Sequence, residues 1–203
     1  MIGIIGAMEE EVAALKNEMT DAKVTEFASM TFYKGTLCGK DAVVVRSGIG
    51  KVNAAICAQI LVDKFGVDTL INTGIAGSLD ARIDIGDMVI STDAVHHDMD
   101  ATIFGDAIGQ VPRMDTRTFP ADPHLVELAV KANEKANPQI HTFTGRVASG
   151  DQFISSGEVK ARIVENFQAL CTEMEGAAIA QTAYRNGVPF VILRAISDKA
   201  DNS

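Results

Sequence analysis

The chain has 203 residues, 47% hydrophobic and 22% charged, which is typical of one compact globular domain. Its formal net charge of −9, with no run of Lys and Arg, disfavours nucleic acid as a partner. Three scattered cysteines without a C-x-x-C pair indicate a reducing, cytoplasmic location, and no apolar run approaches the roughly 18 residues of a membrane span.

Apolar runs alternate with amphipathic stretches along the chain, a pattern that predicts strands and helices layered around a sheet. Residues 1–6 lack a basic region and are expected to form a strand rather than a signal peptide. Further strands are predicted at residues 31–37, 42–46, 69–73, 87–94, 141–149 and 190–196. Helices are predicted at residues 8–19, 52–65, 123–136, 155–167 and 175–186, the fourth opened by a capping box from Ser155 to Glu158.

The connections add two expectations. A turn at residues 38–41 makes the second and third strands a hairpin, so the sheet should be mixed. Residues 95–119 show no sustained period and are read as a long excursion, a kind of loop that usually has a function.

Glycines follow three predicted strands, at Gly6, at residues 47–50 and in a predicted turn at residues 74–77. Ligands bind at the carboxyl edge of open α/β sheets, where glycine lets backbone amides approach them, although each glycine could simply form a tight turn. Gly48 and Gly50 lack the third glycine of a dinucleotide fingerprint, and Gly50 with Lys51 does not complete a P-loop. Neither cofactor motif is met.

Acidic residues at two helix starts are the first candidates for chemistry. At about 100° per residue, Glu11 lies closer to the apolar stripe of its helix than Glu9 or Glu10, so it can face a semi-buried pocket. A purely structural role at the positive helix end is the alternative. Glu173 and Glu175 stand in apolar surroundings, where ribose hydroxyls are candidate partners and solvated charges are the alternative.

Arg194 and Asp198 end the most hydrophobic strand and should lie at the sheet's carboxyl edge. An aspartic acid kept protonated there could donate a proton to a leaving base. Residues 96–100 superficially suggest a metal site, but adjacent residues rarely converge on one ion, so no metal is expected. His124 and His141 have no acidic, Ser or Cys partner nearby in sequence and are expected at the surface or an edge. No G-x-S-x-G nucleophile motif occurs.

Taken in order and spacing, these motifs resemble the 5'-methylthioadenosine/S-adenosylhomocysteine nucleosidase family of the nucleoside phosphorylase superfamily. The matching stretches are residues 2–11, 47–51, 72–74, 97–98, 149–154, 173–175 and 194–198. The resemblance implies a three-layer α/β/α domain over residues 1–203 with a mixed central sheet, nucleoside phosphorylase/hydrolase-like. It implies hydrolysis of methylthioadenosine, adenosylhomocysteine and 5'-deoxyadenosine to adenine in methionine salvage, with no metal or organic cofactor.

The resemblance also implies residue roles. Asp198 would protonate N7 of adenine, Glu11 would activate water and Glu175 would bind the ribose hydroxyls. Phe153 would stack on adenine, with the Ile154 backbone at its edge. The remaining substrate-binding residues implied are Met174 against ribose, Met8 and Ile49 as apolar walls, Gly77, Glu173, Arg194 and Ser197. A homodimer is expected, in which the loop with Phe104 and Pro112 closes the partner's alkylthio pocket.

Two alternatives and two departures accompany the resemblance. A phosphorylase would share the fold but must hold phosphate, which Glu11 should repel although Arg194 is available. A non-catalytic nucleoside binder would lack Glu11 or Asp198, and both are present. Ile75 stands where many relatives have Ser or Thr, so it offers no hydroxyl to the water. The family continues past Asp198 into a terminal helix carrying an aromatic site residue, and the domain as given is expected to lack that helix.

Overall fold

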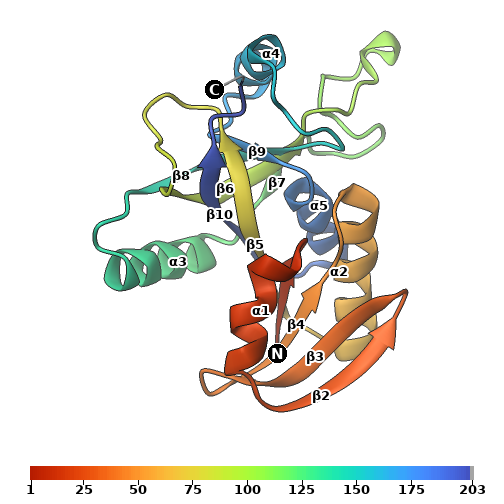
Figure 1. Ribbon diagram of the computed structural model, residues 1–203. Coiled ribbons are helices and arrows are strands. Elements are labelled where there is room, and N and C mark those ends of the chain that lie inside the picture. Colours follow the sequence, from red (N-terminus) through yellow and green to blue (C-terminus); the bar gives the residue numbers. More distant parts are fainter. Residues whose placement is uncertain (202–203) are drawn as a thin grey trace.

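Figure 1 shows the computed structural model, which describes residues 1–201; the last two residues of the expected domain lie outside this range. The described chain is a mixed α/β fold. Its elements are β1 (Ile2–Gly6), α1 (Glu9–Glu18), β2 (Thr20–Phe27), β3 (Met30–Leu37), β4 (Lys40–Arg46), α2 (Lys51–Phe65), β5 (Thr69–Ser78), β6 (Met88–His96), the 3₁₀ turn η1 (Thr102–Phe104), β7 (Phe119–Pro120), α3 (Pro123–Ala136), β8 (Thr142–Ser149), α4 (Gly157–Phe167), β9 (Cys171–Glu173), α5 (Gly176–Asn186) and β10 (Phe190–Asp198).

The strands form one sheet in the order β10-β6-β8-β9-β5-β1-β4-β3-β2, with β7 beside β6. Strand β1 is parallel to β4 and β5, whereas β3 runs antiparallel to both β2 and β4, so the expected hairpin and mixed sheet are confirmed. Strand β10 pairs with β5 as well as with β6. The sheet therefore curls until β10, β6, β8, β9 and β5 close into a ring.

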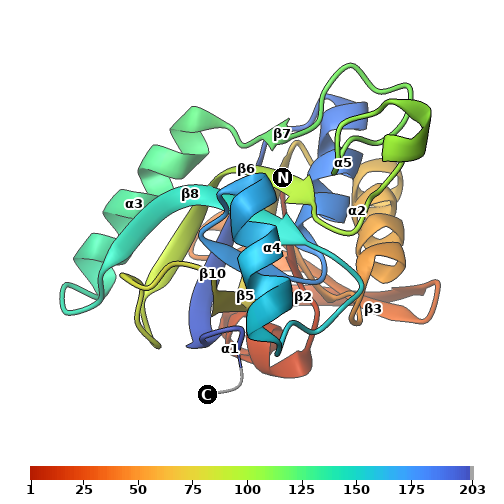
Figure 2. The same cartoon turned by 90° about the horizontal axis from the view of Figure 1, so that it is seen from above.

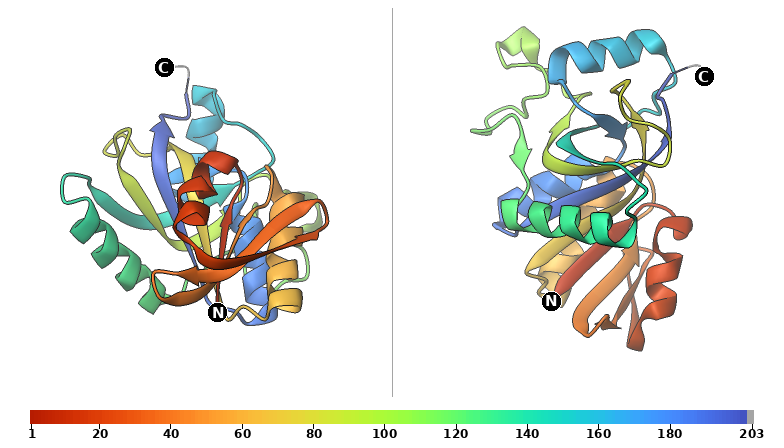
Figure 3. Two further views of the ribbon diagram at one scale, coloured as in Figure 1. Left: turned by 60° about the horizontal axis from the view of Figure 1, so that its bottom comes forward. Right: turned by 90° about the vertical axis from the view of Figure 1, so that its left-hand side faces the viewer.

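Helices cover both faces of the sheet because its strands are apolar on both sides. In β1, Ile5 belongs to the large core cluster that contains Ala54 and Leu61 of α2, and the adjacent Ile4 packs with Val12 of α1. This alternation is the period of two expected of a strand. Figure 3 shows α1 and the pair α2 and α5 on opposite sides of the β1 region, which confirms the layered architecture.

The predicted turn at residues 74–77 is wrong. Strand β5 runs without interruption to Ser78, because β10 pairs with it in parallel from Leu70 through Gly77. A Cβ at Gly74 would collide with the side chains of Arg194 and Glu11. The glycine in this strand therefore leaves room for two charged groups rather than breaking the strand.

Two strands and one helix cap also differ from the sequence prediction. Strand β2 was not predicted, because seven of its eight residues are exposed and no apolar alternation marks it. Strand β9 has three residues, too few for a periodic signal. The capping box at Ser155 is not formed: helix α4 begins after Ser156, whose side chain makes no capping hydrogen bond. By contrast, Asp122 caps α3 as expected, accepting from the Leu125 amide at 3.0 Å.

The excursion between β6 and β7 carries only the short turn η1 within the described residues. In Figure 2 this light-green segment arches outward beside α5 and away from α1. No helix in the part of the chain that the structure describes is long and apolar enough to cross a membrane.

Candidate active site

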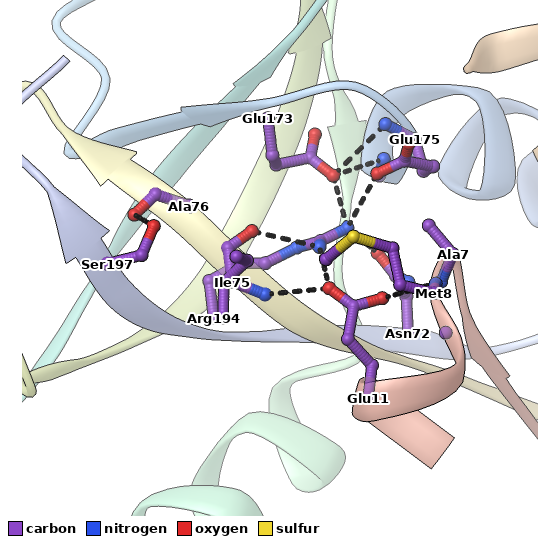
Figure 4. Close-up of polar contacts among 12 residues, drawn as sticks. Ala7, Met8, Glu11, Asn72, Ile75, Ala76, Glu173, Glu175, Arg194 and Ser197 are labelled. Carbon is purple, nitrogen blue, oxygen red and sulfur yellow. Dashed lines mark hydrogen bonds and ion pairs between the residues drawn. The ribbon is translucent and has the colours of Figure 1, made fainter. Parts of the chain in front are cut away.

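Glu11 is held by backbone amides at the start of α1. Its Oε2 accepts hydrogen bonds from the amides of Ala7 at 2.6 Å and Met8 at 3.0 Å, and its Oε1 accepts from the Ile75 amide at 3.0 Å (Figure 4). A glutamate at the third helical position that bonds back to the N-cap amide is half of a capping box. The side chain is only 5% exposed, whereas Glu9 and Glu10 are exposed, in agreement with the helical phase.

Arg194 gathers three carboxylates at the carboxyl edge of the sheet. Its side chain is 1% exposed and its Nη2 donates to Glu173 and, at 2.6 Å, to Asn72 Oδ1. The same nitrogen lies 3.6 Å from Glu175 Oε2, and Nη1 lies 3.9 Å from Glu11 Oε1. Because one buried cation faces three acids, the site carries excess negative charge, as Figure 4 shows around the guanidinium.

Glu173 holds this cluster together. Besides Arg194, its Oε2 accepts from the amides of Glu175 at 3.1 Å and Gly176 at 2.7 Å, and its Oε1 accepts from the Ser149 hydroxyl. Both oxygens are therefore engaged by protein donors, although the residue also lines the cavity. This carboxylate fixes Arg194 and the start of α5 in place.

Glu175 immediately precedes α5, and its side chain lines the same cavity. Its Oε1 accepts from the Gly50 amide at 2.9 Å, which ties it to the loop before α2. Burial, and after it the charge of Glu173, raises the pKa of this carboxyl group from 4.5 to about 7. Arg194 acts in the opposite direction and does not outweigh them. Glu175 thus changes charge near neutral pH.

Asp198 ends β10 next to a bulge. Ile196 pairs with Ala76 and Asp198 with Gly77, so Ser197 is the extra residue, and such bulges re-aim side chains. The Ala200 amide donates to Asp198 Oδ1 at 2.8 Å. The Ser197 hydroxyl lies 2.8 Å from Asp198 Oδ2 and 3.3 Å from the carbonyl oxygen of Ala76. The carboxyl group is thereby fixed at the cavity wall.

These side chains surround one cavity of about 180 Å³, called the reaction cavity below. Most of the residues expected at the site line it: Met8, Glu11, Ile49, Gly77, Phe153, Glu173, Met174, Glu175, Arg194, Ser197 and Asp198. Ile154 is buried and borders a smaller hollow that adjoins the cavity at Asp198 and Phe153. Phe104 and Pro112 do not line the cavity of their own chain, and both are exposed.

Sequence reasoning missed several contributors. Ala7, Ala76 and Thr172 also line the cavity, together with Ile75, which was considered from sequence only for its lack of a hydroxyl. The amides of Ala7, Met8 and Ile75 hold Glu11. Backbone donors leave no residue-type signal, so only the folded chain identifies them. Asn72 stood within a matched motif, and its amide group proves to hold Arg194.

In residues 96–100, which superficially suggest a metal site, the side chains of His96 and Asp98 bond to other parts of the protein. His96 Nε2 lies 2.8 Å from Gln181 Oε1, and Asp98 accepts from Lys51 Nζ at 2.6 Å and the Asp151 amide at 2.9 Å. Burial lowers the pKa of both His96 and His97. Within residues 1–201, no group of three or more His, Cys, Asp or Glu side chains is placed to hold a metal ion.

Comparison with known proteins assigns the chain and its fold to a class. The family model described as phosphorylase superfamily matches residues 1–203. The 5'-methylthioadenosine/S-adenosylhomocysteine nucleosidase of Staphylococcus saprophyticus is 48% identical over 203 residues, covering 99% of this chain and 87% of the relative. The nucleosidase of that name from Neisseria meningitidis, solved with methylthio-immucillin-A, superimposes with a TM-score of 0.95 at 42% identity, covering 99% of this chain and 87% of that one.

A second solved structure is the nucleosidase from Colwellia psychrerythraea in complex with adenine. It has a TM-score of 0.95 and 46% identity over 99% of this chain and 83% of that chain. With the whole-length superfamily match, the chain belongs to the phosphorylase superfamily and, within it, to the 5'-methylthioadenosine/S-adenosylhomocysteine nucleosidase family. The resemblance found in the sequence and the expected nucleoside phosphorylase/hydrolase-like fold are confirmed.

Proposed function

We propose that this chain hydrolyses the N-glycosidic bond of 5'-methylthioadenosine and S-adenosylhomocysteine, and also of 5'-deoxyadenosine, releasing adenine. The observation that carries the proposal is the shared cavity of Glu11 and Asp198, with Arg194 beside Glu11. Cleavage of such a bond requires an acid for the leaving base, stabilisation of an oxocarbenium-like sugar and a positioned water. Three carboxyl groups at this cavity can each meet one requirement.

Asp198 is the proposed proton donor to N7 of adenine. The neighbouring Ser197 hydroxyl is within reach of both Asp198 Oδ2 and the Ala76 carbonyl oxygen. When it donates to Ala76, its lone pairs can accept from a protonated Asp198, and when it donates to Asp198, it stabilises the carboxylate. One hydroxyl therefore supports the acid before and after proton transfer. Phe153, which lines the same end of the cavity, would stack on the base.

Glu175 and Met174 are proposed to bind the sugar. An ionised Glu175 would accept hydrogen bonds from ribose hydroxyls and stabilise positive charge as the glycosidic bond breaks. Its pKa of about 7 means that ionisation, and with it this stabilisation, depends on pH in the neutral range.

Glu11 is proposed to activate the attacking water, with Arg194 as the second positioning group. The Ile75 side chain has no hydroxyl to contribute, but its amide fixes Oε1 of Glu11 at 3.0 Å. The departure at residue 75 thus removes one donor to water while the backbone at the same position still orients the base. This mechanism requires neither a metal nor an organic cofactor.

Phosphorolysis is the alternative reaction in this superfamily, and the charges of the cavity oppose it. Glu11, Glu173 and Glu175 surround Arg194, whose Nη2 is already engaged by Asn72 and Glu173. A phosphate beside the sugar would meet three carboxylates in a poorly solvated site. Water is neutral, so these carboxylates do not repel it.

A homodimer is proposed as the working assembly. Ile103 and Phe104 are 88% and 85% exposed in η1, and neither lines the reaction cavity of its own chain. Exposed apolar groups of this size mark interaction surfaces. We expect a dimer in sedimentation, and a raised KM for methylthioadenosine in Phe104→Ala. A fully active monomer would contradict this assembly.

Adenine release tests the reaction directly. Purified protein is incubated in phosphate-free buffer with methylthioadenosine, adenosylhomocysteine or, as a control for the base, the inosine counterpart of methylthioadenosine. We expect free adenine from the first two substrates. The absence of adenine from both would contradict the proposed function.

A further inference from the structure

A second hollow adjoins the reaction cavity at residues other than Asp198. It has a volume of about 460 Å³ and shares Ala7, Met8 and Ile49 with the reaction cavity. The reaction cavity shares Phe153 and Asp198, by contrast, with the smaller hollow beside Ile154. The reaction cavity therefore adjoins the two other spaces through different residues. The second hollow is called the tail hollow below.

The tail hollow is lined by charged side chains that the proposed reaction does not use. Arg46 ends β4, and Glu9 and Glu10 begin α1 on the other side. Glu9 is paired with Lys16, whose Nζ lies 2.9 Å from each of its carboxylate oxygens. Glu10 and Arg46 are exposed to solvent, and among residues 1–201 neither the Arg46 guanidinium nor the Glu10 carboxylate has a hydrogen-bond or ion-pair partner in the protein. The hollow thus presents one unpaired cation and one unpaired anion.

The direction of a bound nucleoside follows from its chemistry. In a nucleoside, the base and the 5' carbon stand at opposite ends of the sugar ring. If the base contacts Asp198 and the sugar contacts Glu175, the 5' substituent points toward the end bordered by Met8 and Ile49. A thioether and its methylene groups fit that apolar passage. Whatever follows them along the substituent enters the tail hollow.

We infer that the tail hollow binds the α-amino-acid end of S-adenosylhomocysteine, with Arg46 on the α-carboxylate and Glu10 on the α-ammonium group. This inference rests on the proposed function. A guanidinium pairs with a carboxylate through two parallel hydrogen bonds, and a carboxylate accepts from an ammonium group. The unpaired charges match a zwitterion, whereas the methyl group of methylthioadenosine does not reach them. Arg46 and Glu10 are therefore specificity-determining residues between two substrates of one active site.

The test compares kcat/KM for two substrates in each variant. Arg46→Ala and Glu10→Gln are measured with adenosylhomocysteine and with methylthioadenosine. We expect the ratio of kcat/KM, adenosylhomocysteine over methylthioadenosine, to fall about tenfold in each variant, the size expected for one lost charge-assisted hydrogen bond. The change should lie in KM rather than kcat, because the tail does not take part in bond breaking.

Matched controls distinguish the effect of removing a charge in the tail hollow from the effect of removing a charge elsewhere on the surface. Lys23→Ala on β2 and Glu18→Gln on α1 change exposed charges outside the hollow and should preserve the wild-type ratio. A 5'-butylthio analogue of adenosine supplies a tail of similar length without charges. Its kcat/KM should follow that of methylthioadenosine in every variant.

The outcomes are distinguishable. A ratio within about twofold of wild type in both Arg46→Ala and Glu10→Gln would overturn the inference and leave the proposed function standing, as would an equal fall for both substrates. A wild-type protein that releases adenine from neither substrate would overturn the proposed function and this inference together.

Discussion

Oε1 of Glu11 lies 3.9 Å from Nη1 of Arg194, close enough for electrostatic attraction and too far for a direct hydrogen bond. The carboxylate is instead fixed by three backbone amides, and the guanidinium by Asn72 and Glu173. Each group is thus held without a direct hydrogen bond to the other, and both are hydrogen-bonded to the backbone of Ile75. A base and a cation held in this way can both act on a molecule between them without reorganising.

Replacement of Glu11 by Gln should abolish most hydrolysis while preserving binding. Gln keeps the size of the side chain but cannot take a proton from water, so kcat should fall about 10²- to 10⁴-fold. Adenine release from methylthioadenosine measures this change, and calorimetry with adenine measures binding. Glu18→Gln, a change at an exposed position of the same helix, serves as the control. A Glu11→Gln enzyme within about tenfold of wild type would exclude Glu11 as the base.

Asp198→Asn should fold and bind substrate analogues yet lose adenine release. The amide cannot donate an acidic proton to the leaving base, and kcat should fall about 10²- to 10⁴-fold. We expect an assay of adenine release to show this loss, and calorimetry to show unchanged affinity for a substrate analogue. The exposed Asp63→Asn on α2 provides a matched control. Near wild-type turnover in Asp198→Asn would contradict its assignment as proton donor.

The rate of adenine release should fall as pH decreases through about 7. Glu175 has a pKa raised to about 7, so acidification neutralises the carboxylate that is proposed to stabilise the sugar cation. A pH profile of kcat measures the effect. Glu175→Gln should show a low rate without this inflection. An identical inflection in Glu175→Gln would assign it to another group.

The raised pKa of Glu175 should affect stability in the opposite direction from activity: stability should decrease as pH rises. Between pH 4.5 and about 7 the native Glu175 holds a proton that the unfolded chain has lost, so its contribution to the free energy of unfolding decreases as pH rises through about 7. Glu175→Gln should therefore be more stable than wild type at about pH 8, by roughly 1 to 3 kcal/mol, and similar to it below about pH 4.5. Urea unfolding at both pH values checks the sign. Lower stability of the variant at the higher pH would contradict it.

Removal of Arg194 should destabilise the fold. Arg194→Met leaves three buried or half-buried carboxylates without their cation, and breaking such a cluster costs about 3 to 5 kcal/mol. Adding Glu173→Gln to Arg194→Met should recover part of this loss. Urea unfolding measures both variants.

The control for this prediction is Arg82→Ala. Arg82 pairs with Asp80 at the surface, where solvent screens the ion pair, so its loss should leave the unfolding free energy close to that of wild type. Equal stability of Arg194→Met and wild type would show that the cluster is not held by its charge.

Part of this site follows from local sequence. Helical phase alone distinguished Glu11 from its two acidic neighbours, and their burial agrees. The strand ending near Arg194 and Asp198 was evident from its hydrophobicity. Their roles, however, came from the family pattern, because a carboxylate at a strand end is compatible with many reactions.

The remainder depends on pairing between distant segments. The local sequence predicts a turn at Gly74, but pairing with the parallel strand β10 extends β5 through this residue. The convergence of Arg194 with Glu173 and Asn72 likewise arises only when the sheet closes its ring. Local propensity carries no information about such contacts, and the exposed β2 shows the same limit at the sheet edge.

The identity of the sugar product in excess phosphate tests the central claim most directly, since that claim is that Glu11 directs water to the sugar. Methylthioadenosine is incubated with the enzyme with and without phosphate, and the sugar is identified by mass spectrometry. Free methylthioribose at a rate independent of phosphate is the predicted result. Methylthioribose 1-phosphate, formed at a rate that increases with phosphate, would contradict the account.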